Sequence, residues 1–305
     1  MADLALIKKL RETTGCGIAD CNKALSENGD DFEKSVDWLR KKGLSAAVKK
    51  GGRITSEGIV AVQIQGLNAV ILEVNSETDF VARNQKFQDF VKAVASVSFG
   101  VGSDIDKLKA QKYPNSTTTV DEELKNQIGI IGENINIRRV DNVSAKNGLV
   151  ISYVHNAVAP NLGKIAVLVA LESAGDKAKL EEFGRQIAMH IAAAKPDALT
   201  VEAVDPSKLN REIDILKEQA RASGKPDNII EKMMEGRVRK YYEEVVLLEQ
   251  NFVMDDKVKI KDLLKNFGKE LGLDVSISGF KLFILGEGIE KKETDFAAEV
   301  ASMAK

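Results

Sequence analysis

A carboxylate and an aromatic ring stand side by side in the sequence, and together they have the clearest potential for a chemical task. Asp79 and Phe80 lie in the stretch Glu77-Thr-Asp-Phe-Val-Ala-Arg-Asn84. This stretch follows an apolar run over residues 69–74 that is typical of a buried strand, and it opens a helical pattern that continues to about Val97. An apolar ring and a carboxylate at a helix start are also groups that can contact another molecule if they are exposed.

A purely structural interpretation of the same stretch is also open. Thr78 or Asp79 could cap the helix by accepting a hydrogen bond from a backbone N–H, while Phe80 and Val81 pack in its first turn. Caps of this kind are common, so further observations must separate the two interpretations.

Residue combinations that carry enzymatic chemistry are not found elsewhere in the sequence. There is no Gly-x4-Gly-Lys-Ser/Thr phosphate loop and no Gly-x-Ser-x-Gly nucleophile motif. The two cysteines, Cys16 and Cys21, are distant from the two histidines, His155 and His190, so a four-ligand zinc site lacks candidates. We therefore expect no enzyme, no catalytic or metal-binding residue and no cofactor, and we expect both thiols to be reduced.

Composition and charge fit a globular protein of two or three domains. The chain has 305 residues, of which 44% are hydrophobic and 30% are charged. Its net charge of -2 and its aromatic content of 5% argue against direct nucleic-acid binding. No signal peptide or membrane span is visible, so we expect a cytoplasmic protein that does not contact a membrane.

Three short helices are predicted within residues 1–52. The spacing of the apolar side chains places these helices from about Leu4, over residues 18–27 and over residues 32–42. Gly43 is expected to end the third helix, and residues 45–57 are typical of a flexible linker. The sequence thus predicts a small helical module that is joined by this linker to a larger domain.

The larger domain contains an internal duplication, in which two segments have the same order of strand, strand and helix. These elements are predicted at residues 58–65, 69–75 and 79–97, and again at 148–155, 166–172 and 176–194. Each copy ends with a further helix and a strand, which we place at 120–131 and 135–140 in the first copy and at 226–241 and 276–285 in the second. Two such halves predict an α+β protein with helices on one face of each sheet.

The duplication also separates the two interpretations of Phe80. The corresponding junction in the second copy, Ser173-Ala-Gly-Asp-Lys177, keeps an aspartate but has no aromatic residue. Capping can therefore explain Asp79, whereas it leaves Phe80 unexplained. This comparison favours an exposed ring with a function.

Residues 195–225 interrupt the second copy with a predicted helix over residues 207–222. Its apolar side chains form a narrow stripe of Leu209, Ile213, Leu216 and Ala220. A stripe of this width suits one partner helix, which could belong to a second copy of the chain or to a hairpin that packs on itself. Residues 286–305 are expected to form a C-terminal helical module with a stripe of Phe296, Val300 and Met303.

Several blocks of the sequence resemble the elongation factor Ts family, and they are spread over essentially the whole chain. The blocks are the run from Leu10 to Leu25 with its Thr-Gly-Cys-Gly and Asp-Cys pairs, Thr78-Asp-Phe-Val-Ala82, Ile131-Gly-Glu-Asn-Ile-Asn-Ile-Arg-Arg139 and Ile187-Ala-Met-His-Ile-Ala-Ala193. Asn22 departs from the pattern, because many members carry a lysine there. Lys23 is then the remaining amine for a contact at this point.

The resemblance implies a guanine nucleotide exchange factor whose partner is elongation factor Tu. Such a protein binds elongation factor Tu–GDP and promotes GDP release by disturbing the magnesium and phosphate site, so that GTP can load. A ubiquitin-associated-like module at 1–52 would dock on the GTPase domain of the partner. The core repeats would span 53–147 and 148–194 with 226–285, and 195–225 would be a dimerisation-type insertion.

The resemblance also implies which residues contact the partner. The residues that would dislocate magnesium in the partner are Thr78, Asp79, Phe80 and Val81. The other contacts implied are Asp20, Asn22, Lys23, Ile131, Gly132, His155, Val253 and Met254. His190, within an apolar helical run, is expected in the core. A generic adaptor is the competing function, but it would leave the duplicated core and Phe80 without a purpose.

Overall fold

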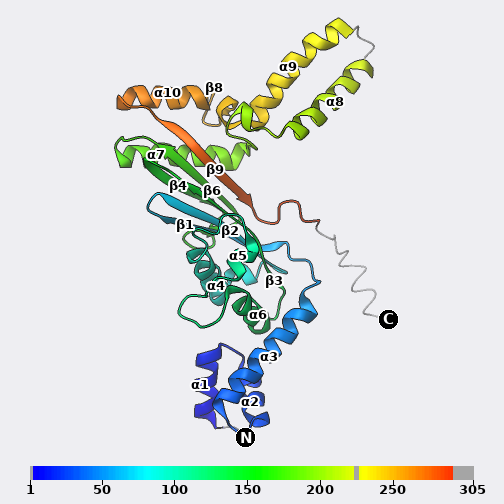
Figure 1. Cartoon of the computed structure of the whole chain (residues 1–305), viewed down its shortest axis with the longest axis vertical. Helices are drawn as coiled ribbons and strands as arrows, with labels where there is room; N and C mark the ends of the chain where they lie inside the picture. The colour runs from blue at the N-terminus through cyan, green and yellow to red at the C-terminus, as the bar shows by residue number, and fades with distance from the viewer. Residues whose placement is uncertain (1–2, 223–226, 291–305) are drawn as a thin grey trace.

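The computed structural model describes residues 3–222 and 227–290 of the chain (Figure 1). The N-terminal helices are α1 (Leu4–Thr14), α2 (Ile18–Glu27) and α3 (Phe32–Lys50). The first repeat contains β1 (Glu57–Gln65), β2 (Asn68–Ser76), the 3-10 helix η1 (Val81–Arg83), α4 (Gln85–Ser96), α5 (Ile105–Lys109), α6 (Val120–Ile131) and β3 (Ile135–Ser144).

The second repeat begins with a hairpin and a helix, which are β4 (Gly148–His155), β5 (Leu162–Gly163), β6 (Ile165–Glu172) and α7 (Lys177–Ala194). There follow η2 (Val201–Ala203), α8 (Pro206–Ala222), α9 (Asp227–Val245), η3 (Leu247–Glu249), β7 (Asn251–Phe252) and β8 (Asp255–Lys259). The repeat ends with α10 (Ile260–Leu271) and β9 (Ser276–Ile284). The N-terminal helices lie at one end of the long axis of the molecule, and α8 and α9 lie at the other (Figure 1).

Strand pairing confirms the two predicted hairpins. The first sheet has the order β3-β2-β1-β5 and the second has the order β4-β6-β9, with antiparallel neighbours in both. In the first hairpin the pairing runs from Glu57 opposite Ser76 to Gln65 opposite Asn68. The strand β5 comes from the connection between β4 and β6, yet it pairs with β1 of the other repeat.

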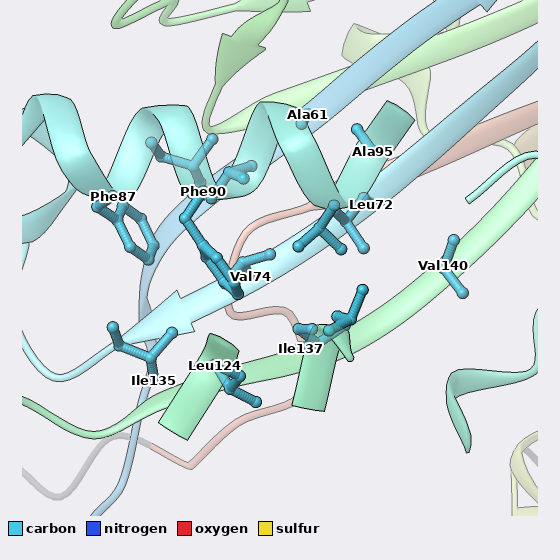
Figure 2. Close-up of a cluster of buried hydrophobic side chains, with 14 of the residues drawn as sticks. Ala61, Leu72, Val74, Phe87, Phe90, Ala95, Leu124, Ile135, Ile137 and Val140 are labelled. Carbon is cyan, nitrogen blue, oxygen red and sulfur yellow. The ribbon is translucent and has the colours of Figure 1, made fainter. Parts of the chain in front are cut away.

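The two sheets pack face to face, and helices cover their outer faces. In β1, Val60 and Val62 face the second sheet, whereas Ile59 and Ala61 face the helices of the first repeat. This alternation follows from the two-residue period of a strand. Figure 2 shows the outer core of the first repeat, in which Phe87 and Phe90 of α4 and Leu124 of α6 lie over residues of β2 and β3. The second repeat repeats the arrangement with α7 and α10. The predicted α+β class, with helices on one face of each sheet, is therefore confirmed.

The third N-terminal helix differs from the prediction. Helix α3 continues through Gly43 to Lys50, so the predicted helix end at Gly43 and the flexible linker over 45–57 are wrong for residues 43–50. Gly43 is buried where α3 crosses α6, and a Cβ atom built on Gly129 of α6 would lie 2.7 Å from the Cα atom of Gly43. The absence of side chains at this crossing lets the two helices approach closely, so a helix joins the N-terminal module to the core.

The end of the second repeat also differs from the prediction. The helix that precedes β9 and packs on its sheet is α10, whose Ile260 and Leu264 lie in the core, and not the helix predicted at 226–241. Helix α9 instead forms a projecting arm with α8 (Figure 1), in which Met234 packs against Ile213 and Leu216. The apolar residues of α10 are concentrated on one face much more strongly than those of α9, in keeping with its place on the sheet. The stripe predicted within 286–305 lies outside the described residues, which end at 290.

Candidate functional site

The ring of Phe80 is exposed on the connection between β2 and α4. Its relative exposure is 77%, which is high for a large apolar side chain. The sequence prediction of an exposed aromatic residue at this junction is therefore confirmed. The neighbouring Asp79 is exposed as well, so a carboxylate and a ring face solvent together.

The capping interpretation of this stretch is wrong. Helix α4 begins at Gln85, and its N-cap is Asn84, whose side chain accepts a hydrogen bond from the backbone N–H of Lys86. The short helix η1 lies between Phe80 and this cap, and it has no side-chain cap of its own. Thr78 and Asp79 are therefore free of the capping task that the sequence pattern offered them.

Thr78 is held instead by a residue of a different loop. One carboxylate oxygen of Glu133 accepts a hydrogen bond from the backbone N–H of Thr78 at 2.9 Å, and the other accepts one from the Thr78 hydroxyl at 2.6 Å. Glu133 lies in the connection between α6 and β3. Hydrogen bonds to a charged acceptor are stronger than those between neutral groups, so this pair fixes the chain immediately before Asp79.

A second carboxylate, that of Glu77, connects the same two loops in the opposite direction, from the Phe80 loop to the connection between α6 and β3. The side chain of Glu77 accepts a hydrogen bond from the backbone N–H of Asn134 at 2.6 Å, and it forms an ion pair with Arg53 at 3.3 Å. The Asn134 side chain in turn donates to the carbonyl of Arg53 at 2.8 Å. The segment that follows α3 is thereby tied to the base of the Phe80 loop.

Beyond Phe80 the chain is fixed by burial. Val81 is 5% exposed and Ala82 is 4% exposed, and both belong to the core of the first repeat. Val81 was predicted to contact the partner, but its side chain lies inside this chain and supports the loop. Thr78 is thus held by hydrogen bonds before Phe80, and Val81 and Ala82 are held by packing after it. The backbone that carries the exposed ring therefore has little freedom to move.

Ile131 and Gly132 lie beside this loop, because they directly precede Glu133. Ile131 is half-buried against the first core, and Gly132 is exposed and ends α6 with a φ of 86°. The ammonium group of Lys50 donates a hydrogen bond to the carbonyl of Gly132, which also brings the end of α3 here.

The predicted contacts Asp20, Asn22 and Lys23 lie on α2, in the N-terminal module. Asp20 pairs with Lys42 of α3, Asn22 is half-buried and Lys23 is exposed. The Lys86 ammonium of α4 donates to the carbonyl of Gly15 at 2.5 Å, which links this module to the helix that follows Phe80.

The remaining predicted contacts lie on the second repeat. His155 is exposed at the end of β4, and its Nδ1 atom lies 3.0 Å from the hydroxyl of Tyr153. Val253 and Met254 are 49% and 54% exposed at the turn between β7 and β8. In Figure 1, α2 and β8 lie near opposite ends of the molecule, so the predicted contacts are spread along its length.

His190 supports the turn that carries Val253. Its side chain is fully buried, as predicted for a core residue. The Nδ1 atom accepts a hydrogen bond from the backbone N–H of Val253 at 3.3 Å, so Nε2 carries the proton and donates to Gln250 Oε1 at 2.9 Å. Burial lowers the pKa of His190, and the Gln250 bond opposes this only in part.

Sequence reasoning did not find the supporting roles of Glu77, Glu133 and Arg53. Glu133 was part of a recognised block, but its partner Thr78 is 55 residues away, and nothing in either segment indicates the pairing. Only the pairing of β2 with β3 brings the two loops together, because Ser76 lies opposite Ile135.

Within the described part of the chain, no group of three or more His, Cys, Asp or Glu side chains could hold a metal ion. Cys16 and Cys21 are free thiols, and burial raises the pKa of both. None of the helices within residues 3–222 and 227–290 has the length and apolar character needed to cross a membrane.

The fold and the site define a class of α+β protein with two sheet-and-helix repeats, an N-terminal helical module and an exposed aromatic residue on a supported loop. The family described as Elongation factor TS matches residues 77–287. The chain is 59% identical to elongation factor Ts of Rhodospirillum centenum over 300 residues, which cover 98% of each chain. It is 55% identical to that of Rhodospirillum rubrum over 302 residues, which cover 99% of this chain and 98% of that protein. The chain therefore belongs to the elongation factor Ts family.

Membership of this family gives the chain a role in translation, as an elongation factor of protein biosynthesis. Proteins of this family exchange a nucleotide on another protein and do not catalyse covalent chemistry.

Proposed function

We propose that the chain binds elongation factor Tu–GDP in the cytoplasm and promotes GDP release by disturbing the magnesium and phosphate site of that GTPase. Phe80, together with Asp79, is the element that enters the partner. GTP can load once GDP has left, and the same contacts accelerate exchange in both directions.

The physical basis of this activity is reciprocal coupling. A GTPase holds GDP through backbone N–H groups of its phosphate loop and through a magnesium ion. A protein that binds the nucleotide-free state more tightly than the loaded state lowers the affinity for GDP by the same factor. No group that forms or breaks a covalent bond is needed.

The observation that supports this proposal most directly is the 77% exposure of Phe80 on a loop that is fixed on both sides. Exposure of an apolar ring of this size to water is unfavourable, and burial of the ring in a partner lowers the free energy. Because the backbone of the loop is fixed, burial of the ring would displace groups of the partner and would not be relieved by a rearrangement of the loop.

The proposal predicts that Phe80→Ala slows GDP release. Burial of a phenylalanine side chain is worth about 1.5–3 kcal/mol, and 1.4 kcal/mol corresponds to a factor of ten in rate, so the expected loss is about tenfold or more. The measurement follows labelled GDP as it leaves elongation factor Tu, with and without the chain.

Ile64→Ala is the matched control. Ile64 is 41% exposed, and it lies at the end of the first hairpin opposite to the Phe80 loop, because it pairs with Ala69. GDP release with this variant is expected to equal that with the wild-type chain. A wild-type chain that does not accelerate GDP release would refute the exchange function.

The spread of the other predicted contacts supports a partner that spans much of the molecule. In this proposal the N-terminal module docks on the GTPase domain through Asp20 and Lys23. Val253 and Met254 contact the same partner at the other end, and His155 and Gly132 add contacts between them. Lys23, His155, Val253, Met254 and the backbone of Gly132 are exposed, and Asp20 is half-buried beside Lys42, so a partner can reach these positions.

Self-association through 195–225 stays a prediction. Two residues of the predicted stripe, Ile213 and Leu216, pack against Met234 within the arm, and Leu209 packs against its base. These contacts favour the hairpin that packs on itself. Sedimentation equilibrium of the purified chain tests the alternative directly.

A further inference from the structure

We infer that Glu133 is a positioning residue for Phe80, and that its carboxylate sets how far and in which direction the ring projects toward the partner. The inference rests on the proposed exchange function, since the ring has a task only if it enters a partner. Glu133 itself touches no nucleotide in this scheme and acts through Thr78.

Both carboxylate oxygens of Glu133 accept hydrogen bonds from the same residue, Thr78. Oε2 accepts from the Thr78 backbone N–H at 2.9 Å and Oε1 accepts from the Thr78 hydroxyl at 2.6 Å. The Ser76 hydroxyl also donates to the carbonyl of Thr78 at 2.9 Å. The backbone N–H, the backbone carbonyl and the side chain of Thr78 are thus all held, two residues before the ring.

The far side of the ring is held by packing. Val81 and Ala82 are buried in the first core, and the Gln88 side chain of α4 donates to the Ala82 carbonyl at 2.9 Å. Only Asp79 and Phe80 lie between the two fixed points. If Thr78 is released, one of the two points is lost and the ring can adopt other positions.

The second repeat has a similar carboxylate clamp, but no aromatic side chain follows it. At the end of β6, Glu172 accepts hydrogen bonds from the backbone N–H groups of Lys146 and Asn147 at 2.8 Å and 2.7 Å. This clamp also ties two loops together. The connection that follows Glu172 has no aromatic residue, so Glu172 is a matched control for the loss of a carboxylate clamp.

The test compares three variants in the GDP-release assay. Glu133→Ala removes both acceptors and is expected to slow release about tenfold, as Phe80→Ala does. With Glu133→Gln, GDP is expected to leave elongation factor Tu at close to the rate seen with the wild-type chain. The amide oxygen of the glutamine can accept from the Thr78 N–H, and its amide nitrogen can donate to the Thr78 hydroxyl. Glu172→Ala is expected to leave the rate unchanged.

A double variant separates positioning from direct contact. If Glu133 acts through the ring, adding Glu133→Ala to Phe80→Ala produces no further slowing, because the group to be positioned is already absent. The proposal is overturned if the two effects multiply or if Glu133→Gln is as slow as Glu133→Ala. Either result would mean that Glu133 affects GDP release by a route other than holding the ring in place.

Amide hydrogen exchange of the chain alone gives a readout that needs no partner. Glu133→Ala is expected to speed exchange in the segment 77–84, whereas Glu172→Ala is expected to leave that segment unchanged. Unchanged protection of 77–84 in Glu133→Ala would overturn the clamp even if the wild-type chain is fully active. An inactive wild-type chain with faster exchange of 77–84 in Glu133→Ala would instead refute the exchange function alone.

Discussion

At the scale of single residues, His190 shows how a buried titratable group can support an exposed contact. Its Nδ1 atom must be unprotonated to accept the N–H of Val253, and the turn that follows presents Val253 and Met254 to solvent. Protonation of Nδ1 would set its N–H against the backbone N–H of Val253, and two donors cannot form a hydrogen bond. The neutral ring is therefore part of the structure of this turn.

This arrangement predicts a pH dependence of stability. The folded pKa of His190 lies below its ordinary value of 6.5, chiefly because the ring is buried. The unfolded chain therefore binds a proton more readily, so the contribution of His190 is complete above pH 6.5 and is lost as the pH falls from there toward the folded pKa. The slope for one proton is at most about 1.4 kcal/mol per pH unit.

Urea unfolding at pH 7.5, 6.5 and 5.5 measures this dependence. His190→Gln is expected to be less stable at every pH and to lose part of the slope below 6.5. Ile64→Ala serves as the control, because it changes an exposed side chain that does not titrate, and it should keep the wild-type slope. An identical slope in His190→Gln and the wild-type chain would contradict the assignment.

At the scale of elements, the crossing of α3 and α6 joins the N-terminal module to the core. Two glycines meet there, but their surroundings differ. A Cβ atom on Gly43 would lie 3.7 Å from the nearest atom, the carbonyl oxygen of Lys125, which is an ordinary contact. A Cβ atom on Gly129 would lie 2.7 Å from the backbone of Gly43, which is closer than carbon atoms pack.

The two alanine variants are therefore expected to differ in sign. Alanine gains about 1 kcal/mol over glycine inside a helix, so Gly43→Ala should keep or raise the Tm. Gly129→Ala has the same gain but must push the helices apart, and overpacking of this kind destabilises by about 1–3 kcal/mol. Thermal unfolding measures both variants, and equal Tm values would show that the helices do not meet as described.

The sequence predicted the elements well where the signal is local. The strands of both hairpins follow from apolar runs, and β1, β2, β4 and β6 lie within two residues of their predicted bounds. Gly43 was misread because a glycine after a helical pattern usually ends it, and only Gly129 explains why the helix continues. Thr78, Asp79 and Asn84 are all good cap residues, so the sequence alone could not choose among them.

The exposed ring was predictable and its support was not. The comparison of the two copies showed that capping left Phe80 unexplained, and this required only the aligned junctions. Glu133 and Glu77 act across loops that meet only after β2 and β3 pair. The assignment of α9 and α10 failed for a related reason, since the periodicity of a helix does not tell which surface it will cover.

At the scale of the whole molecule, a buried carboxylate ties the two repeats together. Glu73 of β2 is fully buried and accepts hydrogen bonds from Arg138 at 3.0 Å and from Arg139 at 2.5 Å, both on β3. It also accepts at 2.8 Å from the backbone N–H of Gly286, which follows β9 of the second repeat. Burial alone would raise the pKa of Glu73, but the hydrogen bonds from Gly286, Asn75 and Arg139 outweigh it, and the pKa is lowered.

Glu73→Gln is therefore expected to destabilise the whole molecule. Removal of one partner from a fully buried ion pair costs about 3–5 kcal/mol, and partial exposure of the two arginines reduces this to about 2–3 kcal/mol. Because the folded pKa is lowered, the contribution of Glu73 is present above the ordinary value of 4.5 and is lost as the pH falls through the folded pKa.

Denaturant unfolding at pH 7 measures the loss. Asp197→Asn is the matched control, because Asp197 and Lys208 form an exposed ion pair that is worth at most about 1 kcal/mol. A Glu73→Gln chain that unfolds at the same denaturant concentration as Asp197→Asn would show that the buried cluster does not hold the repeats together.

The small strand β5 has a consequence for how the first repeat would behave without the second. It belongs to the longer connection of the second repeat, yet Leu162 and Gly163 pair with Ala61 and Val60 of the first. They cover the side of β1 that would otherwise present unpaired N–H and C=O groups, which are a template for unwanted association. The second repeat thus pairs with part of an edge that the first repeat leaves open, and the first repeat expressed separately is expected to self-associate through β1.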